Sequence, residues 1–259
     1  MVLEVADEHL QFTEHDVVIL VIGLTGAGKS TFVNEILGAE RMQIGRGSKP
    51  CTKQVDCAII NPETIQYLHS SSSLRGRRIV IVDTPGFDND DDLSDRDISL
   101  QIATWLETSY ASKKKSNISA GIIYLHDISQ SRYFAESKRT LAFVRALSGN
   151  SAHRVVLGMT KWGRTSSEEE KRNESELVNE HWQAMTTQGS QVCKFDGSRE
   201  SALKVMDILL HQEVDGGDAI WAGIARIRKV YETNEAISRI DRWDRFLSWL
   251  RNLGRRLFA

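Results

Sequence analysis

Short runs of apolar, often β-branched residues alternate along the chain with longer segments in which apolar residues recur every three or four positions. Both faces of each short run would be apolar, which is typical of a strand buried in a helix-covered parallel sheet. The predicted strands are 17–22, 79–82, 121–125 and 154–157, with two further strands at 55–60 and 64–68. The predicted helices are 30–37, 98–110, 137–147, 168–185 and 201–210.

This order of elements predicts a three-layer α/β fold with a mostly parallel sheet and right-handed crossovers. We place that domain at residues 17–213, after an acidic segment at 1–16. A helical extension is expected at 214–259, with Gly216 and Gly217 as its hinge.

Composition narrows the classes of protein that remain. The 33 Lys and Arg residues nearly balance the 35 Asp and Glu residues, which argues against a general nucleic-acid binder. The first sixteen residues contain no Lys or Arg, so neither a secretory nor a mitochondrial leader is expected there. The cysteines, Cys51, Cys57 and Cys193, form no CxxC pair and suit a reducing compartment. We therefore expect a cytoplasmic protein without a nucleic-acid partner.

The strongest chemical signal follows the first predicted strand. The pattern GxxxxGK[ST] is matched without a mismatch by Gly23, Leu24, Thr25, Gly26, Ala27, Gly28, Lys29 and Ser30. The glycines allow successive N–H groups to surround a phosphate, and the following helix adds its positive dipole end. We expect Lys29 to reach the β- and γ-phosphates of a nucleotide and Ser30 to bind Mg²⁺. Thr31 is assigned to the same nucleotide site.

A second motif closes the predicted strand 79–82. An acidic residue at a strand end beside a phosphate loop, here Asp83, can hold Mg²⁺ through water. Gly86 offers its N–H at the position of the γ-phosphate, where a side chain would obstruct it. The acidic loop 88–92 stands where a nucleotide-sensing switch would be.

With these motifs the chain resembles the P-loop GTPases, specifically the group of septins, chloroplast import receptors, immunity-associated GTPases and fungal G domain-containing proteins. The resemblance covers residues 17–210 and also rests on 50–53 and 122–126. It implies a G domain that binds GTP or GDP with Mg²⁺. It further implies that Thr52 is the switch threonine that coordinates Mg²⁺ and senses the γ-phosphate, with Ser48 as its rival. Lys29, Thr52 and Gly86 would then form the catalytic set.

The guanine-reading motif of that group is incomplete in this chain. Its usual form is Asn/Thr-Lys-x-Asp, and the chain has Thr160, Lys161 and Trp162 followed by Gly163. The first three are assigned to the base. The missing carboxylate removes a group that selects guanine and rejects adenine, so ATP or mixed specificity remains open. Trp162 either stacks on the base or packs within the protein.

Hydrolysis is expected to be slow, because Phe87 stands where the group has its water-positioning Gln. Without that helper the rate would be ~10⁻⁴ to 10⁻² s⁻¹. His126 and Arg132 flank a loop that, in the resembling group, faces a second G domain in nucleotide-dependent dimers. Arg132 would either supply charge to the other copy or remain solvated.

The last 39 residues carry nine basic against four acidic side chains. Apolar residues recur there at helical spacing: Ile237, Ile240, Trp243, Phe246, Leu247, Leu250, Leu253 and Leu257. Such a stripe either lies in an anionic membrane interface or packs on the G domain or on another copy of the chain.

Taken together, the sequence predicts a GTP-binding switch with slow Mg²⁺-dependent hydrolysis of GTP to GDP. A nucleotide-dependent homodimer and a peripheral membrane or protein contact of the C-terminal helix are its expected partners. The alternatives are a non-hydrolysing nucleotide-binding interaction module and an ATPase of the same fold.

Overall fold

The computed structural model describes residues 11–44, 54–60, 74, 77–87, 94–114, 118–131, 133–211 and 218–233. Its centre is a six-stranded sheet in the order β2-β3-β1-β4-β5-β6, in which only β2 runs antiparallel to its neighbour. The strands are β1 (Val17–Gly23), β2 (Asp56–Ile60), β3 (Ile79–Asp83), β4 (Ser119–Asp127), β5 (Val155–Thr160) and β6 (Gln191–Lys194). The expected mostly parallel sheet is confirmed.

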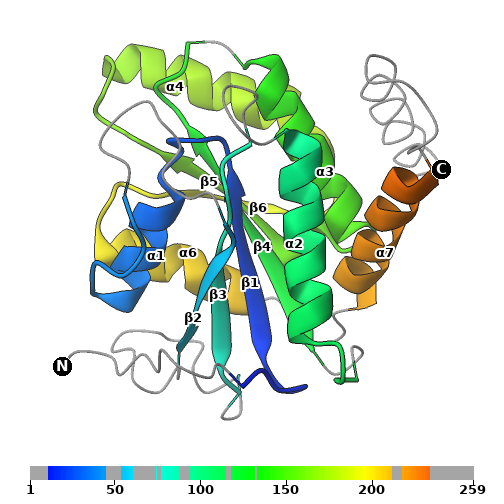
Figure 1. Cartoon of the computed structure of the whole chain (residues 1–259). Coiled ribbons are helices and arrows are strands. Elements are labelled where there is room, and N and C mark those ends of the chain that lie inside the picture. The colour runs from blue at the N-terminus through cyan, green and yellow to red at the C-terminus, as the bar shows by residue number, and fades with distance from the viewer. Residues whose placement is uncertain are drawn as a thin grey trace.

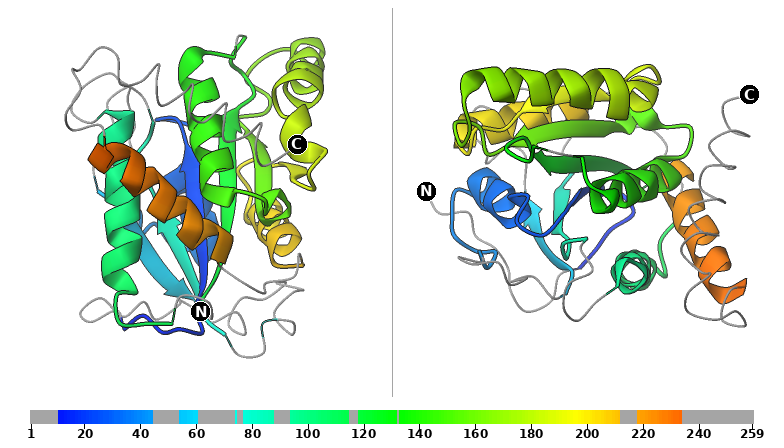
Figure 2. Two further views of the ribbon diagram at one scale, coloured as in Figure 1. Left: turned by 90° about the vertical axis from the view of Figure 1, so that its right-hand side faces the viewer. Right: turned by 90° about the horizontal axis from the view of Figure 1, so that it is seen from above.

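Helices cover both faces of this sheet, as Figures 1 and 2 show. One face packs against α1 (Lys29–Leu37) and α6 (Arg199–His211). The other packs against α2 (Asp95–Ser109), α3 (Ala135–Ser148) and α7 (Asp218–Thr233). The segment between β5 and β6 contains α4 (Ser167–Glu176), the π-helical turn η5 (Leu177–His181) and α5 (Gln183–Thr186), and a short 3₁₀ turn, η4 (Ala152–Arg154), precedes β5. The fold is therefore the expected three-layer α/β sandwich.

The expected single helix at 168–185 is wrong, because the chain widens into a π turn at Leu177–His181. The Trp182 N–H donates to the Leu177 carbonyl five residues earlier, at 2.7 Å. Residues five apart lie about 140° from each other around an α-helix. The wider turn brings Leu177 and Trp182 into the same buried cluster, which explains its presence here.

Other differences are confined to the ends and edge of the sheet. The strand expected at 154–157 lies at Val155–Thr160, because Arg154 belongs to the 3₁₀ turn before it. The edge strand β6 was missed, since two of its four residues are exposed and polar and break the apolar run. The expected strand 64–68 lies outside the described residues.

The first part of the expected C-terminal extension packs on the domain. Ile220, Ile224 and Ile227 of α7 belong to the core that also contains α2 and α3. Arg228 of α7 forms an ion pair with Glu107 of α2, with 2.6 Å between Nη2 and Oε2. The apolar stripe from Ile237 onward lies outside the described residues, and its membrane or protein contact stays a prediction. None of the helices within the described ranges combines the length and the apolar character needed to cross a lipid bilayer.

Candidate functional site

The phosphate loop joins the end of β1 to the start of α1, as the motif requires. Gly26 and Gly28 adopt left-handed backbone conformations, with φ of 75° and 93°. Gly28 is the residue from which α1 begins. Such conformations are open to glycine at little cost, and they turn successive N–H groups toward one point.

The charged side chain of the loop folds over the loop itself. The Lys29 ammonium donates to the carbonyls of Gly23 and Leu24, at 3.2 and 3.0 Å, and the side chain is buried. A Lys held over the loop in this way lies where the outer phosphates of a nucleotide would bind. The half-buried Thr31 lies one turn into the same helix.

The two residues assigned to Mg²⁺ meet in space although 53 positions separate them. The Ser30 hydroxyl donates to Asp83 Oδ2 at 2.6 Å, and Asp83 is buried at the end of β3. A hydroxyl beside a carboxylate is a donor set of hard oxygens that suits Mg²⁺. Thr52, the third expected ligand, and its rival Ser48 lie outside the described residues, as do the switch loops around them and at 88–92.

Gly86 is pressed against the phosphate loop. A Cβ added to it would overlap the backbone and the hydroxyl of Thr25. The Thr25 hydroxyl is buried and has no hydrogen-bond partner among the described residues. The chain is held in this position because Thr84 Oγ1 donates to the Val21 carbonyl at 2.8 Å. Only a residue without a side chain lets the two loops approach this closely.

Phe87 points away from this space. Its side chain is 1% exposed and packs on Phe143, with ring centroids 5.0 Å apart. The residue that follows Gly86 therefore contributes core packing, and its side chain cannot orient a water molecule in the site.

The end of β5 is tied to the phosphate loop. Thr160 Oγ1 donates to the Ala27 carbonyl at 2.9 Å. Lys161 has a φ of 60°, and its ammonium forms an ion pair with Asp127 Oδ2 at 2.8 Å. A Cβ at Gly26 would lie only 3.8 Å from Lys161 Nζ, so this side chain reaches the phosphate loop. Strained backbone of this kind persists where neighbouring structure holds it, often at ligand sites.

The ring of Trp162 is engaged within the protein. Its Nε1–H donates to the Met159 carbonyl at 2.8 Å, and Lys194 Nζ lies over one face, 4.3 Å from the ring centroid. These contacts favour the packing interpretation of Trp162, while its assignment to the base stays a prediction.

His126 is the next-to-last residue of β4 and stands just before the loop that it was expected to flank. It is 3% exposed and packs among Tyr133, Trp182 and Tyr124. Burial lowers the pKa of His126 to about 4, with smaller effects of Asp127 and His181. The imidazole is therefore neutral at physiological pH. Arg132, its expected companion, lies outside the described residues.

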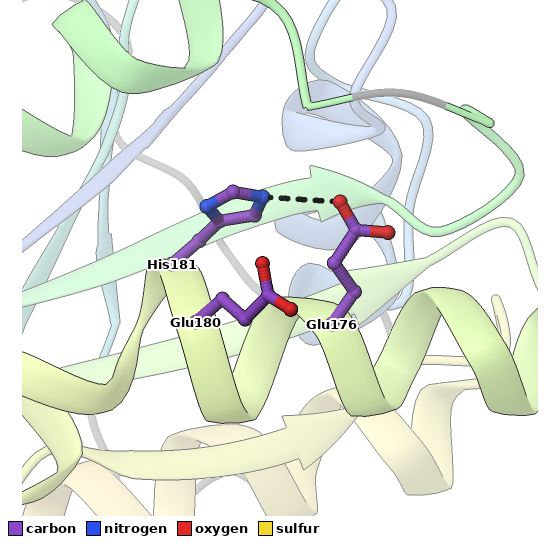
Figure 3. Close-up of side chains that lie close together, drawn as sticks. All are labelled: Glu176, Glu180 and His181. Carbon is purple, nitrogen blue, oxygen red and sulfur yellow. Dashed lines mark hydrogen bonds and ion pairs between the residues drawn. The ribbon is translucent and has the colours of Figure 1, made fainter.

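One polar group that the sequence did not indicate is the trio Glu176, Glu180 and His181, at the end of α4 and in the π turn (Figure 3). His181 Nε2 lies 3.3 Å from Glu176 Oε1. The imidazole also stacks on Tyr133, with centroids 4.1 Å apart. The hydrogen bond to Glu176 and the stacking on Tyr133 account for the position of the His181 ring.

Known proteins match the part of the chain that contains this site. A family model described as "50S ribosome-binding GTPase" matches residues 18–161. Arabidopsis thaliana Toc33 in complex with GDP and Mg²⁺ superposes with a TM-score of 0.55 at 14% identity, covering 78% of this chain and 87% of that chain. An Era variant from Aquifex aeolicus bound to GDP.AlF4⁻ gives 0.51 at 14% identity, covering 76% and 56%. Identities this low show a shared fold alone. Among curated protein sequences there is no significant match.

Proposed function

Because the chain belongs to the family of 50S ribosome-binding GTPases, we propose that it binds GTP with Mg²⁺, hydrolyses it slowly to GDP and acts as a nucleotide-dependent switch. The observation that carries this proposal is the meeting of Ser30, Asp83 and Gly86 around the phosphate loop. These residues come from two separate strand ends.

The chain's own groups would hold the phosphates. The N–H groups of residues 25–30 and the start of α1 surround the β-phosphate, and Lys29 exchanges its loop carbonyls for phosphate oxygens. Ser30 and Asp83 would hold Mg²⁺, directly and through water, and the ion supplies positive charge beside the β- and γ-phosphates when bound. The Gly86 N–H faces the γ-phosphate.

Hydrolysis then requires little covalent chemistry from the protein. The oxygen of a water molecule bonds to the γ-phosphorus as the bond from that phosphorus to the bridging oxygen breaks, and the water's protons leave to phosphate and solvent. Lys29 and the backbone N–H groups stabilise the charge that develops. Phe87 is buried in the core, so the side chain at this position does not orient the attacking water. This supports a slow reaction.

Two alternatives each rest on a specific residue. The burial of Phe87 favours a non-hydrolysing module in which the bound nucleotide only sets an interaction state. Gly163, in place of a carboxylate, favours an ATPase of the same fold. We further propose that two copies pair through the G domain in a nucleotide-dependent way; one Toc33 structure in the comparison is described as a dimerization-deficient mutant. The apolar stripe from Ile237 onward, with the basic residues around it, would provide a separate contact with a membrane or a protein.

The test is to denature the purified protein, identify the released nucleotide and time the turnover of added GTP with Mg²⁺. Released GDP and slow phosphate production are expected. Adenine nucleotide would contradict guanine preference, and no phosphate over hours would favour the binding module.

Lys29→Ala should abolish nucleotide retention, because it removes the only side-chain cation that the described phosphate loop contributes. Lys204→Ala, on an exposed position of α6, is the matched control and should retain nucleotide. Equal retention by both variants would refute the phosphate-loop assignment.

A further inference from the structure

The position at which this family usually carries its base-reading carboxylate is occupied by Gly163 in this chain. Gly163 has a φ of 79°, a conformation that side-chain-bearing residues rarely adopt. A Cβ built on it would have no protein atom within 4 Å. The space beside Gly163 is therefore open, and no side chain of residue 163 enters it.

A carboxylate from another element reaches this same point. Glu170 lies in the first turns of α4, which begins after the N-cap Ser166, and α4 is at the top of the view in Figure 1. Its Oε1 accepts a hydrogen bond from the N–H of Gly163, seven residues earlier. The Glu170 carboxylate is thus held beside the backbone of Gly163, the residue that has no carboxylate of its own.

The Glu170 carboxylate has few partners among the described residues. The residue is only 9% exposed, yet within the described part of the chain no Lys, Arg or His forms an ion pair with it. The single N–H of Gly163 is the donor that the structure supplies, and a carboxylate can accept several hydrogen bonds. The Glu170 side chain has no buried oxygen without a partner, so Oε2 is open to solvent and can accept hydrogen bonds from a ligand.

The neighbouring carboxylates are engaged elsewhere. Asp127 pairs with Lys161 through Oδ2 and accepts from the N–H and hydroxyl of Ser129 through Oδ1. Asp196, after β6, accepts from Ser198 and Ser201. Of these three carboxylates, Glu170 accepts the fewest hydrogen bonds from the described residues and retains the most capacity for a ligand.

We propose that Glu170 replaces the missing carboxylate and reads the guanine base. The Watson–Crick edge of guanine presents two neighbouring donors, N1–H and the 2-amino group, which match the acceptors of one carboxylate. Adenine presents an unprotonated N1 there and would meet the carboxylate with a lone pair. Gly163 follows Lys161 by two residues, and Lys161 reaches the phosphate loop, so the open space beside Gly163 adjoins the nucleotide site.

This inference rests on the proposed function, and nucleobase analogues separate the two. Glu170→Gln keeps an oxygen that can accept the Gly163 N–H but replaces the second acceptor with an NH₂ donor. That donor suits xanthine, which carries a carbonyl at position 2. Affinities of the full chain for GDP and xanthosine diphosphate are measured for both proteins by fluorescent-nucleotide competition. We expect Glu170→Gln to lose about 10- to 100-fold in GDP affinity, as for a charged hydrogen bond, and to gain affinity for xanthosine diphosphate.

Glu168→Gln is the matched control, because it makes the same change on the exposed side of the same helix and should leave both affinities unchanged. The native protein provides a measurement that does not depend on how a variant folds. It should bind inosine diphosphate, which lacks the 2-amino group, at least about 10-fold more weakly than GDP. Equal affinities for GDP and inosine diphosphate, or an unchanged GDP-to-xanthosine-diphosphate ratio in Glu170→Gln, would overturn the role of Glu170. Absence of all guanine-nucleotide binding by the native protein would overturn the proposed function itself.

Discussion

The two ends of the candidate nucleotide site are built in different ways. At the phosphate end, contacts run between backbone atoms and a few side chains of contiguous motifs, such as Lys29 with the carbonyls of its own loop. At the base end, side chains come from β4, the residue after β5, β6 and α4. Asp127 lies 34 positions from Lys161 and 43 from Glu170, and Lys161 and Glu170 lie 9 positions apart. The phosphate end joins two short contiguous motifs, residues 23–30 and 83–86, whereas the base end is assembled from single side chains of several elements.

This difference follows from what each end must recognise. A phosphate is bound by any set of converging N–H groups, which only a particular backbone path provides, so the sequence there is narrowly constrained. A base edge needs one donor or acceptor at one place, and several elements can deliver it. We therefore expect changes at the phosphate end to abolish function and changes at the base end to alter preference.

The largest effect is expected from Gly86→Ala. Its Cβ would overlap Thr25 and force the two loops apart, which would displace the N–H that we propose faces the γ-phosphate. Loss of one such donor lowers kcat by roughly 10² to 10³-fold. Single-turnover GTP hydrolysis measures this. Gly189→Ala, at the other end of β6 with a φ of 102°, adds backbone strain away from the site and should leave hydrolysis near normal. Equal loss in both variants would point to general destabilisation.

A smaller effect is expected from Asp127→Asn. The amide keeps an acceptor for Ser129 but replaces the ion pair with Lys161 by a neutral contact. The difference between charged and neutral hydrogen bonds is about 1 kcal/mol, or roughly fivefold in affinity. GDP dissociation constants at low and high salt would measure it. Glu107→Gln, which breaks the ion pair between α2 and Arg228 of α7, is the control. An effect of a hundredfold at Asp127 would contradict the distinction between the two ends.

The last prediction concerns stability beneath the base end, not nucleotide affinity or turnover. Burial lowers the pKa of His126 in the folded protein to about 4, below its ordinary value. The unfolded chain therefore binds more protons between about pH 6.5 and pH 4, and the free energy of unfolding falls as the pH is lowered through that range. Between pH 7 and pH 5 the contribution is about 2 kcal/mol at most.

Urea denaturation of the native protein and of His126→Phe at these two pH values isolates that contribution. The native protein should lose more stability than the variant, whose ring cannot be protonated. Parallel losses in both proteins would show that other groups dominate the acid response.

The resemblance to P-loop GTPases is confirmed by the family match, and the fold class by the sheet order. Both were accessible from sequence because buried parallel strands and the phosphate loop leave local patterns. The π turn was not, since Leu177 and Trp182 share a core only when the packing of the whole segment is known. Strand β6 lacks an apolar run, and Glu170 meets Gly163 only through the geometry of the loop between them. These features depend on tertiary contacts that no single window of sequence contains.

The π turn at Leu177–His181 has a further consequence for the helix before it. A π turn holds one residue more than an α turn, so it sets the rotational phase of α4 relative to the anchored Trp182. Deleting the exposed Asn179 would restore regular winding and rotate α4 by about 100°. Asn173 would then leave the carbonyl of Ile128, to which it donates at 2.9 Å, and Glu170 would swing away from Gly163. The one extra residue of the π turn thus fixes the rotation of α4 about its axis, although it is far from the phosphate loop in sequence.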